Sequence, residues 1–89
     1  MKFVWDKAKN NENIEKHGVS FEEAQLAFSD VNRKVENDND HSTISEKRYF
    51  LYGDTGQGIV TVRFTVREGN IRIFGAGYWR KGKKKYEQS

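Results

Sequence analysis

The stretch Ile59–Arg67 reads IVTVRFTVR, and its strict alternation predicts a β-strand with one buried face. One face would carry Val60, Val62, Phe64 and Val66, and the other Thr61, Arg63, Thr65 and Arg67. Glu68-Gly69 follows at once and predicts a tight turn, because glycine accepts positive φ. The next stretch, Asn70–Ala76 (NIRIFGA), alternates again. We therefore predict an antiparallel hairpin at the centre of the fold.

Other segments predict the rest of a sheet. Arg48–Gly53 (RYFLYG) is rich in aromatic residues and predicts a strand before the hairpin, and Val31–Val35 is a weaker candidate. Phe3-Val4-Trp5 is a short apolar run that could form an edge strand.

Two helices are predicted before these strands. Asp6 is a suitable N-cap for a helix that ends near His17, with Gly18 as its stop. Asparagine disfavours helix in this segment, so we expect packing of Trp5, Ala8 and Ile14 to hold it. Ser20 and Glu23 have capping-box spacing, which predicts a second helix ending near Ser29-Asp30.

The predicted fold is α+β, with two N-terminal helices packed on a roughly four-stranded antiparallel sheet and a basic C-terminal tail. We expect one domain over residues 1–86 and a disordered tail over 87–89. The chain has 89 residues and no cysteine, which excludes disulfides and thiolate chemistry. It contains neither a signal peptide nor a run long enough to span a membrane, so the expected location is the cytoplasm.

Charge is distributed unevenly along the chain. Residues 1–46 carry six Lys/Arg and ten Asp/Glu, a balance of −4, whereas residues 47–89 carry ten and three, a balance of +7. A basic half favours an anionic partner, with nucleic acid the first candidate, although charge can also serve solubility alone.

Several arginines would share the solvent face of the sheet. Arg63 and Arg67 lie two alternations apart on one strand, with Arg72 and Arg48 on other strands. Arginine presents a planar fork of donors that matches phosphate oxygens, so these residues could bind a polyanion. The alternative is a solvated face with scattered ion pairs.

The C-terminal stretch WRKGKKKY combines two aromatic residues with five basic residues in Arg80–Lys85. This composition suits base stacking and phosphate contact, and it makes RNA-binding candidates of Trp79, Arg80, Lys81, Lys83 and Lys84. A frayed basic terminus would have the same composition.

Candidate proton donors and acceptors are few. His17, beside Lys16, can exchange a proton near neutral pH, but a histidine at a helix C-terminus is also favoured by the helix dipole. Asp38, Asp40 and His41 are the one candidate metal cluster, and a polar loop is the better interpretation because the glycine and glutamate of a calcium loop are missing. No cofactor is expected.

The sequence has no Walker loop, GxSxG or HExxH motif, and no carboxylates clustered for two-metal catalysis. Any nuclease chemistry would then be independent of metal and would act on RNA, whose 2′-hydroxyl supplies the nucleophile that DNA lacks.

The segment FVWDKAKNNENIEKHGVSFEEAQLAF, the Asp38–Ser42 segment, EKRYF and IRIFGA together resemble the BrnT family of type II toxin–antitoxin toxins. The resemblance runs from Phe3 to about Tyr86. It implies a RelE-like α+β fold, ribonuclease activity without a metal, and inhibition of translation. It also implies a BrnA-like ribbon–helix–helix antitoxin, through which the complex would contact operator DNA.

Carried over by position, the resemblance implies roles for Lys16, His17, Arg48, Arg67 and Arg72. We expect the three arginines to hold the scissile phosphate and His17 or Tyr49 to move a proton, while Lys16, Arg63 and the C-terminal cations bind RNA. One feature departs from the family pattern, which ends the last strand with S-A-R, because this chain has Gly75-Ala76-Gly77. Either Arg80 or a later lysine replaces that arginine, or activity is altered.

Two other functions stay open. The basic half could be a non-catalytic domain that binds RNA or an acidic protein, and the missing arginine favours this. Its surface could also serve mainly to dock an antitoxin, which is compatible with a toxin role.

Overall fold

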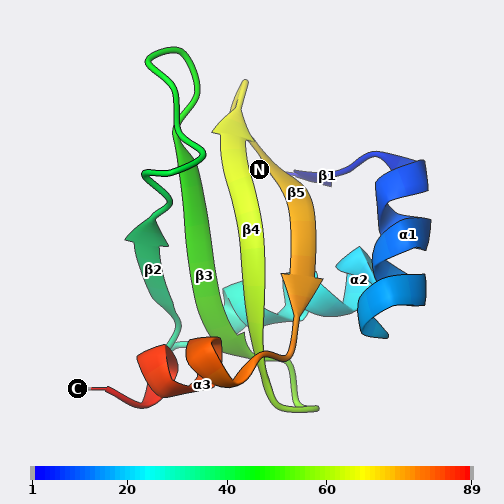
Figure 1. Cartoon of the computed structure of the whole chain (residues 1–89), viewed down its shortest axis with the longest axis vertical. Coiled ribbons are helices and arrows are strands. Elements are labelled where there is room, and N and C mark those ends of the chain that lie inside the picture. The colour runs from blue at the N-terminus through cyan, green and yellow to red at the C-terminus, as the bar shows by residue number, and fades with distance from the viewer. Residues whose placement is uncertain (1, 89) are drawn as a thin grey trace.

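The predicted hairpin forms the centre of the sheet in the computed structural model, which describes residues 2–88 (Figure 1). Strand β4 (Ile59–Arg67) pairs antiparallel with β5 (Asn70–Gly77). Both turn residues have positive φ, 54° at Glu68 and 78° at Gly69. The turn is therefore of the mirror-image kind that suits the twist of a hairpin.

The sheet is larger than predicted and is not purely antiparallel. Its order is β1-β5-β4-β3-β2, with β3 at Arg48–Asp54 and β2 at Lys34–Asn37 in antiparallel pairing. Strand β1 (Phe3–Val4) pairs parallel to β5. The prediction of a four-stranded antiparallel sheet was wrong in this respect, since a two-residue strand has no alternation from which to read its direction.

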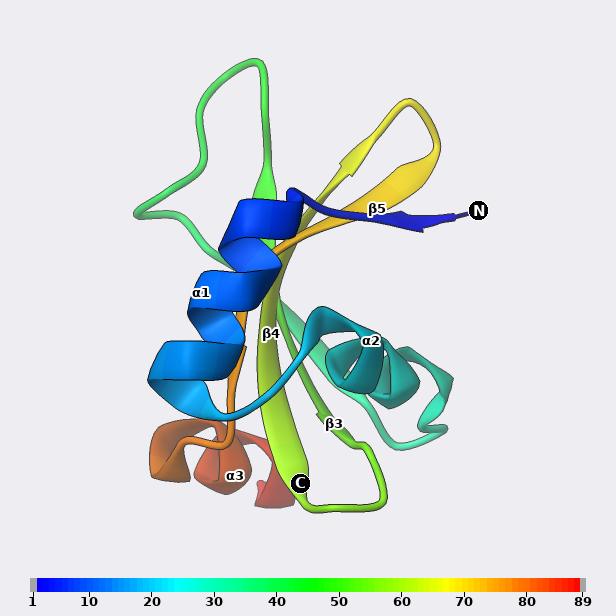
Figure 2. The same cartoon turned by 90° about the vertical axis from the view of Figure 1, so that its right-hand side faces the viewer.

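One face of the sheet holds the core. Helix α2 (Phe21–Ala24) continues into a 3₁₀ helix, η1 (Gln25–Ser29), and both lie across this face (Figure 2). The largest fully buried side chains of this core include Phe21, Leu51, Ile73 and Val62. Ser20 caps α2 as predicted, because its hydroxyl accepts a hydrogen bond from Glu23 N at 3.0 Å.

Helix α1 (Lys7–His17) begins and ends where the sequence predicted, with Asp6 Oδ1 accepting from Lys9 N and Gly18 at φ 71°. Of its three predicted anchors, Trp5 does pack against the core, with its ring centroid 6.0 Å from that of Phe21, but the other two were predicted wrongly. Ala8 and Ile14 are exposed, whereas Asn10 and Asn13 are each only 8% exposed. The Asn13 amide donates to the carbonyls of Val19 and Ala76, both at 2.9 Å, and its Oδ1 accepts from Ala76 N. Asn13 disfavours helix, but it holds α1 to the sheet because its amide pairs with backbone groups at the free edge of β5.

The basic C-terminal segment is not a tail, because residues Arg80–Glu87 form helix α3. The two views place α3 on the sheet face opposite α2 (Figures 1 and 2). Gly82 is buried there, against Thr61 and Tyr52. We predicted disorder for residues 87–89. Glu87 is the last residue of α3, and Ser89 lies outside the described residues.

The carboxylate of Asp30 joins three segments. It accepts from Asp54 N at 2.8 Å, from the Tyr86 hydroxyl at 2.7 Å and from Asn32 N at 2.9 Å. These donors, the Asp54 N–H first, hold the pKa of Asp30 below its usual value. The end of α3 is therefore tied to the β3–β4 turn by an ionised carboxylate.

A pH dependence of stability follows from this lowered pKa. The contribution of Asp30 should be complete above about pH 4, the usual aspartate pKa, and should be lost as pH falls through the lower folded value. Asp30→Asn should flatten the acid limb of a plot of melting temperature against pH, measured by circular dichroism. Asp40→Asn, in the exposed loop, is the matched control. An unchanged acid limb in Asp30→Asn would show that this carboxylate is not linked to folding.

Within residues 2–88, no helix has the length and apolar character needed to cross a membrane.

Candidate functional site

We call the sheet face opposite α2 the open face. A pocket of about 310 Å³ lies between α1 and this face. Helix α1 contributes Lys9, Glu12, Asn13, Lys16 and His17. The sheet contributes Arg48 from β3, Arg63 from β4, and Phe74 and Gly75 from β5. Trp79, the residue before α3, completes the lining. We call this the cationic pocket.

The floor of the cationic pocket depends on an irregularity in β5. Arg63 pairs with Gly75 but Phe64 pairs with Ile73, so Phe74 is an extra residue in a β-bulge. Gly75 has no side chain and leaves the floor open. The Phe74 ring lies beneath two cations, with the Arg48 guanidinium carbon 4.1 Å and Lys9 Nζ 5.5 Å from its centroid. These cation–π contacts position charge without neutralising it.

The pocket is strongly electropositive. Four cationic side chains line it against the single carboxylate of Glu12. Lys16 Nζ donates to Glu12 at 2.9 Å, and this hydrogen bond lowers the pKa of that carboxyl. The pair is exposed and contributes little to stability, but it offsets the one negative charge. The remaining cations are available to an anion.

His17 faces the pocket from the end of α1, edge-on to Trp79, with ring centroids 5.2 Å apart. Trp79 in turn covers Gly77, where an added Cβ would lie 2.4 Å from two atoms of the indole. A side chain at position 77 would therefore collide with this ring. The indole occupies the place where the resemblance leads one to expect an arginine.

The structure brings together five of the residues singled out from the sequence: Lys16, His17, Arg48, Arg63 and Trp79. Arg67 lies elsewhere, near the β4–β5 turn, with its guanidinium 2.8 Å from Glu46. Arg72 is on the same sheet face as Arg48, with Thr65 between them, and is outside the pocket lining.

The C-terminal cations Arg80, Lys81, Lys83 and Lys84 do not line the cationic pocket either. Arg80 and Lys83 line a hollow beside Tyr78, and Lys81 lines a groove under α3. Lys84 is exposed on α3. Tyr49 lies on the core face of the sheet, where its ring stacks on Phe64. Neither Arg80 nor Tyr49 is thus placed for the role expected of it.

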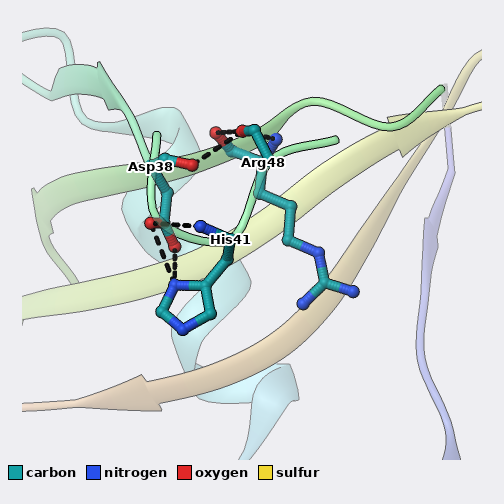
Figure 3. A network of polar contacts seen from close by, with 4 residues as sticks. Asp38, His41 and Arg48 are labelled. Carbon is teal, nitrogen blue, oxygen red and sulfur yellow. Dashed lines mark hydrogen bonds and ion pairs between the residues drawn. The ribbon is translucent and has the colours of Figure 1, made fainter. Parts of the chain in front are cut away.

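The loop after β2 holds a second histidine (Figure 3). His41 Nδ1 lies 2.9 and 3.0 Å from the two carboxylate oxygens of Asp38, which is 4% exposed. Asp38 N donates to the Arg48 carbonyl at 2.8 Å, and Ser42 Oγ accepts from Arg48 N. Figure 3 shows the His41 ring and the Arg48 side chain extending to the same side of the strands. The loop therefore fixes the start of β3, and it presents His41 with Nε2 directed away from Asp38.

Among the described residues, no group of three histidine, aspartate or glutamate side chains is arranged to hold a metal ion. The Asp38–His41 contact agrees with a structured polar loop in the region considered for calcium.

Five residues of the pocket lining were not among the site candidates from the sequence: Lys9, Glu12, Asn13, Phe74 and Gly75. A usable signal existed for two of them, because Lys9, Asn13, Lys16 and His17 recur at helical spacing on one face of α1. Alternation with Ile71 and Ile73 does assign Phe74 to the open face beside Arg72, but it does not reveal the bulge that places Gly75 opposite Arg63.

A pocket that four cationic side chains and a histidine line, on an open sheet face of a small α+β domain, has the chemistry to hold an anion such as a phosphate group. Residues 5–83 match the model of a family described as "Ribonuclease toxin, BrnT, of type II toxin-antitoxin system". The match covers most of the chain, so the protein belongs to the BrnT family. Membership indicates a ribonuclease toxin and implies an antitoxin partner. Among curated proteins, none matches the chain.

Proposed function

We propose that the cationic pocket is the active site of a metal-independent, RelE-like endoribonuclease that inhibits translation. The observation that carries this proposal is the convergence of Arg48, Arg63 and His17, from three separate elements, on one open pocket. The family described above supports it.

The proposed reaction is transesterification at an RNA phosphate. The ribose 2′-oxygen loses its proton and attacks the adjacent phosphorus, and the bond to the 5′-oxygen breaks. The leaving 5′-oxygen takes up a proton, so the products are a 2′,3′-cyclic phosphate and a 5′-hydroxyl. Arg48 and Arg63 stabilise the extra negative charge on the phosphate oxygens in the transition state. His17 takes or gives the proton, and Lys9 and Lys16 hold the neighbouring backbone.

We further propose a cytoplasmic toxin that is neutralised by a BrnA-like ribbon–helix–helix antitoxin, with operator DNA contacted only through that partner. The open sheet face gives an acidic segment of the antitoxin the same cations that RNA would use, so binding would block the pocket.

A non-catalytic RNA-binding domain is the second candidate. One observation favours it: the indole of Trp79 fills the space at Gly77, and no arginine can occupy that position without moving the ring.

Purified protein incubated with single-stranded RNA separates the two functions. We expect defined cleavage products that persist in EDTA, and none from DNA of the same sequence, which lacks the 2′-hydroxyl. An Arg48→Ala preparation made in parallel controls for contaminating nuclease. Binding of RNA without products would favour the binding domain, and loss of cleavage in EDTA would refute metal independence.

The same assay assigns the proton transfer. His17→Ala should slow cleavage by a factor of about 10²–10⁴, the usual range for a general acid or base. His41→Ala should have a small effect, because His41 does not line the pocket. The reverse order of effects would transfer the role to the Asp38–His41 pair.

A further inference from the structure

A groove with aromatic walls adjoins the cationic pocket. It lies between α3 and the open sheet face and has a volume of about 280 Å³. Phe50 and Tyr52 of β3 form one wall and Trp79 another, with Lys81 and Lys85 of α3 at the rim. We call it the aromatic groove.

The groove and the cationic pocket adjoin each other at Trp79, which lines both. Phe50 is the direct cross-strand partner of Arg63, so the two side chains lie next to each other on the same sheet face. If a phosphate of a bound polynucleotide contacts Arg63, the next nucleotide would therefore lie at Phe50.

The chemistry of the groove matches a nucleotide. The Phe50 and Tyr52 rings are nearly parallel, at 14°, with centroids 6.2 Å apart, and Trp79 is 38% exposed. Tyr52 is only 5% exposed, so it backs the partly exposed Phe50 ring rather than offering a face of its own. Nucleobases stack on aromatic rings that an open sheet presents as it presents Phe50. The one carboxylate in the lining, Glu36, accepts from the Tyr52 hydroxyl at 2.6 Å and lies 3.3 Å from Lys85 Nζ. Its charge is thus offset, and Lys81 remains for a phosphate.

We propose that the aromatic groove binds the base of the nucleotide adjacent to the phosphate in the cationic pocket, so that the ligand is single-stranded RNA with at least one unpaired, stacked base. Phe50 supplies the stacking surface and Lys81 contacts the following phosphate. The proposal rests on the proposed function for the identity of the ligand as RNA, but it does not require that the RNA be cleaved.

The test measures binding of an uncleavable probe, a 2′-O-methyl RNA oligonucleotide, by fluorescence anisotropy with the full chain. Phe50→Leu keeps an apolar side chain of similar size but removes the ring face, and Phe50→Trp retains it. We expect Phe50→Leu to weaken binding on the order of tenfold, and Phe50→Trp to bind as the wild type does. An oligonucleotide with abasic residues should bind wild type and Phe50→Leu equally. Unfolding curves establish that both variants are folded.

The outcomes separate this inference from the proposed activity. Equal binding of the base-containing probe by wild type and folded Phe50→Leu would refute base binding in the aromatic groove, even if wild type cleaves RNA. Binding that depends on Phe50, in a protein that does not cleave RNA, would support base binding in the aromatic groove and refute the proposed nuclease activity. Loss of antitoxin association in Phe50→Leu, with oligonucleotide binding unchanged, would assign the groove to a protein and also overturn the proposal.

Discussion

Replacing Arg48 with alanine is expected to slow RNA cleavage by a factor of about 10²–10³, the usual effect of losing one donor to a developing anion. Arg48 lines the cationic pocket, and its guanidinium lies over Phe74 and is not paired with a carboxylate of residues 2–88. It is therefore positioned before the ligand arrives, and its charge is available to the transition state. The measurement is the single-turnover rate on a labelled RNA.

Arg67→Ala is the matched control for this prediction. Arg67 has the same side chain and lies on the same sheet face, but it pairs with Glu46 outside the pocket. We expect Arg67→Ala to cleave RNA at close to the wild-type rate, because Arg67 does not line the pocket. Arg48→Lys should recover only part of the rate, since an ammonium keeps the charge but not the planar fork. A large loss in Arg67→Ala with a small loss in Arg48→Ala would move the site to the β4–β5 turn.

The contrast between these two arginines shows how far sequence alone could locate the site. Alternation assigns Arg63 and Arg67 to one face of β4, but it does not say which part of that face is covered and which is open. That depends on α1, which crosses near Arg63, and on Glu46, which reaches Arg67 from a loop. Both are contacts between segments distant in sequence, and neither has a local pattern.

The same contrast between local patterns and contacts of distant segments applies to the prediction of the fold. The hairpin and the two helix starts follow from local chemistry, because turn and cap residues act within three or four positions. The parallel direction of the edge strand β1 and the anchoring of α1 by Asn13 do not, since the use of Asn13 depends on a free edge at Ala76, 63 positions away.

Helix α3 was missed for a different reason. A run of lysines has no apolar stripe from which to predict packing, and the helix docks through Gly82, a residue that normally weakens helices. The glycine permits contact because it has no side chain. Gly82 interrupts a run of basic residues in the sequence, and it is the residue through which α3 contacts the sheet.

Gly82→Ala is accordingly expected to lower the free energy of unfolding by about 1–3 kcal/mol, the usual range for overpacking, although alanine favours helix by about 1 kcal/mol. A Cβ at this position would lie 1.8 Å from Thr61 Oγ1 and 3.1 Å from Tyr52 Cδ1. Helix α3 would have to move away from the sheet, and Trp79 with it. We therefore also expect weaker RNA binding, because Trp79 lines the cationic pocket.

A double-mutant cycle tests whether this contact is the cause. Thr61 Oγ1 is buried without a hydrogen-bond partner among the described residues, so Thr61→Ala alone removes an unsatisfied group and should change stability little. In that background the closest atom to the new methyl is removed, and Gly82→Ala should recover about 1 kcal/mol or more of its loss. Urea denaturation of the four proteins measures the coupling. Additive effects would mean that α3 does not approach β4 as closely as the structure shows, and Trp79 would then need another support beside His17.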